Sequence, residues 1–121
     1  MQYLSGVAVG NYALFGGGEE NNSNVTTIVN SYNKSLTRGI PTALSSARKY
    51  MTATSVNGFA LFIGGQGNNA VVDVYDESLT RSVTTSLKTG RRFAGSATIG
   101  NYAIVAGGYP TTSSVEVYVS N

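Results

Sequence analysis

Residues 57–65 read NGFALFIGG, and this stretch decides the fold. Asn57-Gly58 is a pair typical of the tight turn of a β-hairpin. The FALFI run that follows is continuously apolar, as expected for a strand that is buried on both faces. Two glycines end the run. A glycine pair after a buried strand occurs in phosphate-binding loops and also in structural turns, so its recurrence elsewhere in the chain becomes the deciding question.

The stretch occurs three times. GNYALFGGG at 10–18 and GNYAIVAGG at 100–108 match it. A second motif follows each glycine pair, and its first residues are 43 positions apart: Val29, Val72 and Val115. A third motif, ARKYMTATSVN at 47–57, is matched by GRRFAGSATIG at 90–100 and by a shortened form at 3–10. Self-similarity at a fixed period indicates a repeat architecture.

Each full repeat contains four segments with strand character, and no window shows the apolar spacing of a helix. In the second repeat these segments are 50–56, 59–63, 71–76 and 81–87. Short strands at regular spacing predict an all-β fold. Four strands in about 43 residues are typical of a β-propeller blade. We therefore expect a single segment of three four-stranded antiparallel blades over 1–121, the last one lacking its outer strand, with repeats at approximately 1–46, 47–89 and 90–121.

The repeat resembles the kelch repeat. In that pattern an arginine leads into a strand of small residues, an apolar strand ends in Gly-Gly, and a strand of the V-x-V-Y-D kind follows. Arg48, Gly64-Gly65 and residues 72–76 fill these places in the second repeat, and Arg91, Gly107-Gly108 and VEVY do so in the third. The likeness covers essentially the whole chain. It departs from the family in one respect, because kelch repeats commonly carry a Trp near the outer strand and this chain has none.

Three blades cannot close a ring, because propellers have about four to eight blades. An open arc would expose the apolar flanks of its end blades. Two chains that associate head to tail would close a six-bladed ring with two-fold symmetry, so we expect a homodimer. The alternative is a piece of a longer kelch protein, such as a phage or cell-surface appendage that recognises glycans or proteins.

The glycine pairs are expected to be structural. A dinucleotide site requires a helix after the glycine-rich loop, whereas a strand follows each pair here. Recurrence in all three repeats favours a backbone conformation or a close packing contact that needs glycine. We therefore predict no cofactor, and a structural role for Gly17, Gly18, Gly64, Gly65, Gly107 and Gly108.

The most concentrated charge lies in two basic pairs, Arg48-Lys49 and Arg91-Arg92. Both precede the innermost strand of a blade, so we expect them on one rim or at the mouth of the channel. One hypothesis is a basic ring that binds a carboxylate or another acidic partner. The other, which the family pattern favours, is that each arginine ties neighbouring blades together through carbonyls or through Asp73 and Glu116.

Most of the Tyr and Phe residues recur at matching places in the repeats, which favours packing in the core or between blades over a stacking platform for ligands. These sets are Tyr3, Tyr50 and Phe93; Tyr12, Phe59 and Tyr102; and Tyr32, Tyr75 and Tyr118. Glu19, Gln66 and Tyr109 differ, since each follows a glycine pair and the residue varies from repeat to repeat. A variable position at a loop tip is a candidate ligand contact.

The amino-acid composition excludes several classes of function. The chain has no His and no Cys, which removes the commonest general base, the commonest transition-metal ligand and thiolate chemistry. We predict no catalytic residues and no metal site. The formal net charge of +2 is too small for a nucleic-acid footprint. No apolar run is long enough for a membrane span, and the start lacks the features of a signal peptide, so a soluble protein of unknown compartment is expected.

These expectations combine into a non-catalytic binding or structural module that self-assembles, with a protein or glycan ligand at the rim. A propeller enzyme that processes sugars is the remaining alternative.

Overall fold

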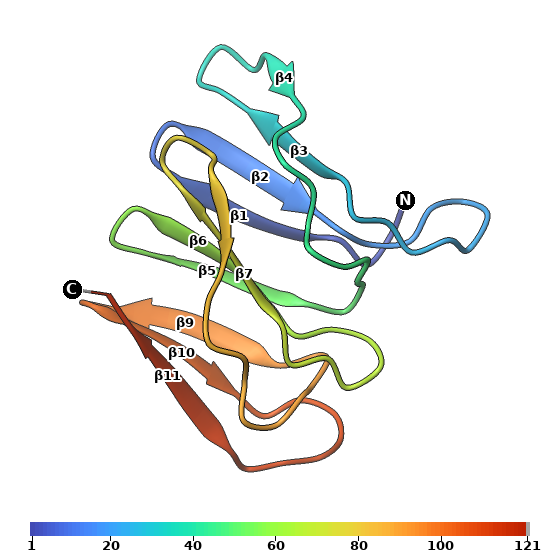
Figure 1. Ribbon diagram of the computed structural model, residues 1–121, viewed down its shortest axis with the longest axis vertical. Coiled ribbons are helices and arrows are strands. Elements are labelled where there is room, and N and C mark those ends of the chain that lie inside the picture. The colour runs from blue at the N-terminus through green and yellow to red at the C-terminus, as the bar shows by residue number, and fades with distance from the viewer. Residues whose placement is uncertain (121) are drawn as a thin grey trace.

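A computed structural model describes residues 1–120 and contains three antiparallel β-sheets, with no helix among these residues (Figure 1). Sheet 1 consists of β1 (Ser5–Val9), β2 (Tyr12–Gly16), β3 (Val29–Tyr32) and β4 (Arg38–Gly39). Sheet 2 consists of β5 (Thr52–Val56), β6 (Phe59–Ile63), β7 (Val72–Asp76) and β8 (Arg81–Val83). Sheet 3 consists of β9 (Gly95–Ile99), β10 (Tyr102–Ala106) and β11 (Val115–Val119). Consecutive strands are neighbours in every sheet, and the described chain has no helix that could cross a membrane.

The prediction of an all-β fold is confirmed, and one sheet falls within each sequence repeat. The outer strands are shorter than expected. β8 ends at Val83, although the pattern predicted a strand over 81–87. Beyond it the chain turns so that Leu87 is buried and its N–H donates to the Ala70 carbonyl at 2.8 Å. Burial of one leucine between sheets therefore ends the strand.

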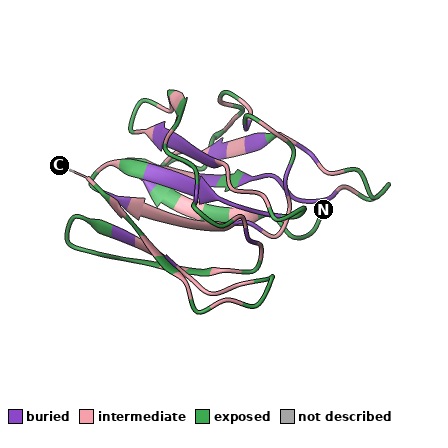
Figure 2. Cartoon of the chain, turned by 60° about the horizontal axis from the view of Figure 1, so that its bottom comes forward, coloured by how far each residue is buried: buried purple, intermediate pink, exposed green. Residues whose placement is uncertain are grey.

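The three sheets follow one another from top to bottom of Figure 1, with β1, β5 and β9 side by side. One apolar cluster fills the space between sheets 1 and 2 and includes Leu14, Phe62 and Tyr75. A second cluster, which includes Leu61, Ile63 and Val105, lies between sheets 2 and 3. Figure 2 shows the buried residues in purple gathered in strands at the middle of the molecule. Sheet 2 is thus covered on both faces, which accounts for the continuously apolar sequence of β6.

The Asn57-Gly58 hairpin turn is also as predicted. Both residues have positive φ, +46° and +81°, and Val56 pairs with Phe59 across the turn. Positive φ at both central residues belongs to the two-residue turn whose twist matches that of antiparallel strands. This short turn sets the register of β5 on β6, and so determines which side chains of the innermost strand face the neighbouring sheets.

Candidate functional site

Arg48 and Arg91, the first residues of the two basic pairs, point into the protein. The Arg48 side chain is fully buried, forms an ion pair with Asp73 and donates to the Gly64 and Val71 carbonyls at 2.8 and 2.9 Å. Burial lowers the pKa of the Arg48 guanidinium, and the Asp73 carboxylate acts in the opposite direction. Arg91 repeats the arrangement, with the Glu116 carboxylate at 2.7 Å. Both side chains therefore lie away from any ligand in solvent.

Lys49 and Arg92, the second residues of the pairs, are partly exposed, and the Lys49 side chain retains 12% of its surface. The Lys49 ammonium is 3.5 Å from the Glu19 carboxylate and 5.0 Å from the ring centre of Tyr50. The Arg92 guanidinium lies 4.4 Å from the ring centre of Tyr109. Within residues 1–120, Arg92 forms no ion pair. Of the four basic residues, these two can meet a ligand, and Arg92 has its charge uncompensated by a neighbouring carboxylate.

Three aromatic side chains pack in a row, here called the rim ladder: Tyr3, Tyr50 and Phe93. Their ring centres are 4.6 Å and 4.4 Å apart. The backbone N–H of Tyr50 donates to the Tyr3 carbonyl, and that of Phe93 donates to the Tyr50 carbonyl. Tyr3 is 46% exposed and Phe93 60%. The expected contact between neighbouring repeats is present, but it lies at the surface and not in the core.

All three residues of the rim ladder adopt the left-handed region of backbone conformation, with φ of +61°, +62° and +57°. This conformation is rare for bulky residues and costs of order 1 to 3 kcal/mol at each position. Sequence pattern alone could not reveal it, because the repeat shows only that an aromatic recurs there.

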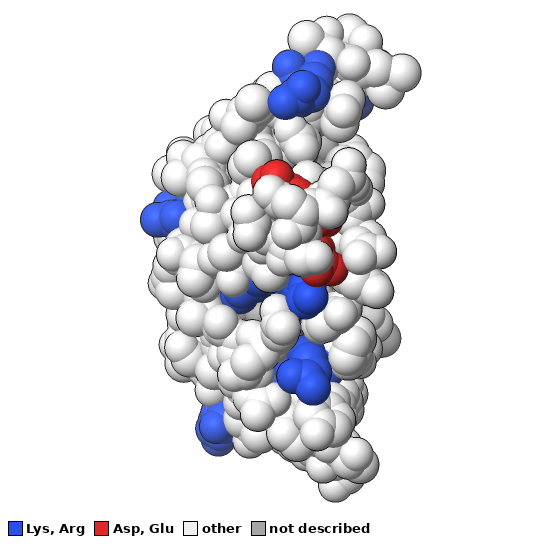
Figure 3. Space-filling model, turned by 90° about the vertical axis from the view of Figure 1, so that its right-hand side faces the viewer, with Lys and Arg blue, Asp and Glu red and all other residues white. Residues whose placement is uncertain are grey.

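The three variable residues that follow the glycine pairs lie beside the rim ladder. The N–H groups of Glu19, Gln66 and Tyr109 donate to the carbonyls of Gln2, Lys49 and Arg92, at 2.8, 2.8 and 2.7 Å. Glu19 is buried and is bonded to the Gln2 side chain, whereas Gln66 and Tyr109 are exposed. The structure thus gathers these three residues, Lys49 and Arg92 on one rim. Figure 3 views this side of the molecule and shows basic side chains spread along its length.

The glycine pairs are the points at which one sheet's loop meets the segment that leads into the next sheet. The N–H groups of Gly18 and Gly65 donate to the Arg48 and Arg91 carbonyls, each at 2.8 Å. A Cβ on Gly17 or Gly64 would collide with these same carbonyl oxygens. Gly107 differs, because a Cβ there would meet no atom within 4 Å. The contact made twice inside the chain has no counterpart at sheet 3 among residues 1–120.

Sheet 3 has an open apolar face on the side away from sheet 2. Ile99, Val115 and Val117 lie on this face and are all more than half exposed. Their counterparts one repeat earlier are Val56, Val72 and Val74, which are buried against sheet 3. The sequence predicts exposed flanks in general terms, and the structure identifies the residues.

Sheet 1 also has an open face, on the side away from sheet 2. Phe15 is 40% exposed, whereas its counterpart Phe62 is fully buried between sheets 1 and 2. Tyr32 is half-buried, whereas its counterpart Tyr75 is fully buried. Each open face therefore carries side chains of the type that form the two internal interfaces.

Compared with known proteins, the chain matches no family model and no curated sequence.

Proposed function

We propose that the protein is a non-catalytic, kelch-like propeller module that closes a six-bladed ring with a second copy of itself. The observation that supports this most directly is the match between its two open faces. The face of sheet 3 resembles the face that sheet 2 presents to sheet 3, and the face of sheet 1 resembles the face that sheet 2 presents to sheet 1. A contact between unlike faces of two chains is heterologous, and two such contacts close a ring when the rotation fits.

Backbone hydrogen bonding supports the same docking. Inside the chain, the second glycine of each pair donates to the carbonyl of the arginine that follows in the next repeat. Among residues 1–120, the Gly108 N–H has no such acceptor. The repeat counterpart of Arg48 in the first repeat is Met1, so the Met1 carbonyl of a second chain is the group that would accept this bond. The Tyr3 N–H of that chain would likewise donate to the Phe93 carbonyl and continue the rim ladder.

The test is the mass of the protein in solution, measured by light scattering. We expect twice the chain mass for the unmodified protein. Ile99→Asp places a charge on the open face of sheet 3 and should give a monomer, because burial of an unpaired carboxylate is unfavourable. Val83→Asp is the matched control, since Val83 is also exposed but lies on the outermost strand of sheet 2. A protein that is monomeric at every concentration would contradict the proposal.

A second role, ligand binding at the rim, is favoured by a separate observation. Three aromatic residues keep a costly backbone conformation while remaining at the surface, and the adjacent Arg92 guanidinium has no carboxylate partner among the described residues. This combination suits a ligand that presents a carboxylate, on a protein or on an acidic glycan.

Arg92→Ala tests this role on an array of acidic glycans and acidic peptides. We expect it to abolish binding, whereas Arg38→Ala, which removes another exposed arginine, should leave binding unchanged. Binding that survives Arg92→Ala, or an array without any bound ligand, would exclude the rim as the site.

A further inference from the structure

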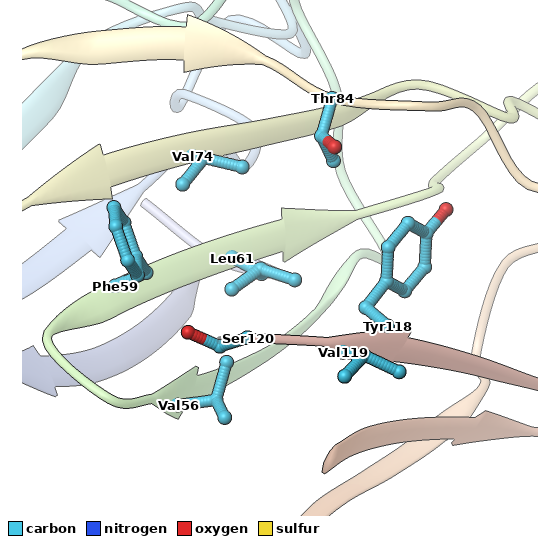
Figure 4. Close-up of a pocket in the computed structure, with 8 residues that line it drawn as sticks. All are labelled: Val56, Phe59, Leu61, Val74, Thr84, Tyr118, Val119 and Ser120. Carbon is cyan, nitrogen blue, oxygen red and sulfur yellow. The ribbon is translucent and has the colours of Figure 1, made fainter. Parts of the chain in front are cut away.

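A groove of about 320 Å³ lies between sheets 2 and 3 (Figure 4). Its floor comes from sheet 2 and one wall from the end of β11, and most of the lining is apolar: Val56, Phe59, Leu61, Val74, Tyr118 and Val119. Ile99, Val115 and Val117, the residues named on the open face of sheet 3, do not line it. No residue of the described chain fills it.

The corresponding place between sheets 1 and 2 is filled by a leucine. Leu79, in the turn between β7 and β8, packs on the cluster that contains Val9, Tyr12 and Leu14. These three residues are the repeat counterparts of Val56, Phe59 and Leu61, which line the empty groove. The molecule therefore displays, one repeat earlier, the side chain that suits this groove.

The edge of β11 is open beside the groove. β7, the counterpart of β11, pairs with β6 on one side and with β8 on the other, whereas within residues 1–120 β11 pairs with β10 alone. A second groove, of about 680 Å³, follows this edge and is lined by β11 and by the segment that includes Thr85 and Ser86. An unpaired edge beside an apolar groove is the arrangement by which sheets accept an additional strand.

The arginine of the Ser-Leu-Thr-Arg motif (SLTR), which occurs at 35–38 and 78–81, provides a third point of correspondence. In sheet 2, Arg81 of β8 donates to the Ala43 carbonyl at 2.8 Å. The counterpart of Ala43 is Ser86, which lines the second groove. Similarly, the hydroxyl of Tyr75 donates to the Thr42 carbonyl, and that of Tyr118 donates to the Thr85 carbonyl. The wall against which β8 lies in sheet 2 is thus already formed at sheet 3.

We propose that the two grooves and the edge of β11 form an acceptor site for an extended peptide segment of the Ser-Leu-Thr-Arg type that lies outside residues 1–121. The segment pairs antiparallel with β11, its leucine fills the apolar groove, and its arginine donates to the Ser86 carbonyl. Val115 and Val117 border both this site and the ring contact, whereas Ile99 belongs to the open face alone, so a change at Ile99 distinguishes the two interactions.

The experiment is titration of the protein with a synthetic peptide that copies residues 78–85, SLTRSVTT, followed by calorimetry and by amide hydrogen exchange. We expect saturable binding together with slower exchange of β11 amides. The same peptide with Asp in place of leucine should bind at least about tenfold more weakly, because the apolar contact is lost. Phe59→Ser in the protein should weaken binding of the unmodified peptide in the same direction.

Three results would overturn the proposal: no binding, equal binding of the Asp peptide, or unchanged exchange in β11. A peptide that converts a two-chain assembly into single chains would also overturn it, because a second copy of the chain would then be the occupant. Ile99→Asp separates the two proposals. If this variant is monomeric and still binds the peptide, both hold; if it never differs in mass from the unmodified protein, only the ring is contradicted.

Discussion

The alternation between inward and outward side chains decides what the basic residues can do. The two side chains of each basic pair point in different directions. Arg48 and Arg91 are buried, whereas Lys49 and Arg92 lie at the rim. The sequence predicts the pairs and their acidic partners. It could not assign the directions, because these residues stand in an irregular segment that lacks the two-residue period of a strand.

The buried ion pair of Arg48 and Asp73 should be essential for stability. Asp73→Ala leaves a buried guanidinium without its carboxylate, and we expect a loss of about 3 to 5 kcal/mol in the free energy of unfolding, measured in urea. Glu116→Ala is the comparison, with a smaller loss, because the Glu116 side chain is 12% exposed, against 0% for Asp73, so that its ion pair is less desolvated. Replacing both partners by Met and Leu should recover most of the stability. An unchanged unfolding curve for Asp73→Ala would contradict this role.

Two phenols, the buried Tyr75 and the half-buried Tyr118, should make stability depend on alkaline pH. Burial, with a smaller contribution from a neighbouring carboxylate, raises the pKa of Tyr75 and of Tyr118 from 10.0 to about 12. Above pH 10 the unfolded chain loses these protons before the folded chain does. The contribution to stability is therefore complete below pH 10 and decreases as the pH rises towards 12.

Urea unfolding at several pH values between 9 and 12, chosen around the pKa values above, measures this decrease. Tyr75→Phe and Tyr118→Phe should each reduce the slope, and the double variant should remove most of it. A slope unchanged in the double variant would assign the alkaline loss to other groups.

At the scale of elements, hydrophobic pattern and turn residues were sufficient for most strands. FALFI predicts β6 residue for residue, and Asn57-Gly58 predicts the turn before it. The outer strands were less predictable, because β8 ends where the chain leaves the sheet to bury Leu87. The rim ladder was not predictable as a surface feature, since recurrence of Tyr3, Tyr50 and Phe93 is equally compatible with a core position.

The turns of the SLTR motif offer a matched pair of leucines. Leu79 packs between sheets 1 and 2, whereas Leu36, at the same place in sheet 1, is 79% exposed. We expect Leu79→Ala to lower the free energy of unfolding by about 1 to 2 kcal/mol, less than for a fully buried leucine. Leu36→Ala should change it by less than about 0.5 kcal/mol in a monomeric background such as Ile99→Asp. Equal losses would show that the turn does not act as an anchor between sheets.

At the scale of the whole molecule, the open face of sheet 1 and the open face of sheet 3 have no packing partner within residues 1–120. Association of such faces has two outcomes: a closed ring, or an open chain that grows by one protomer at a time. The rotation between neighbouring sheets decides between them, and repeat spacing in the sequence does not contain this angle. The number of repeats alone therefore supports the ring as a hypothesis without distinguishing it from a filament.

A concentration series separates the two outcomes. For a closed ring of two chains, the mass measured by light scattering should rise from one to two chain masses and then stay constant, because no free face remains. An open assembly would continue to grow with concentration. Leu36→Ala should shift the monomer–dimer midpoint to higher concentration without changing the plateau, since Leu36 is expected to lie at the new contact between sheet 1 and the partner's sheet 3. Growth beyond two chains would contradict the closed ring while leaving the heterologous contact itself in place, and Ile99→Asp would then stop the growth.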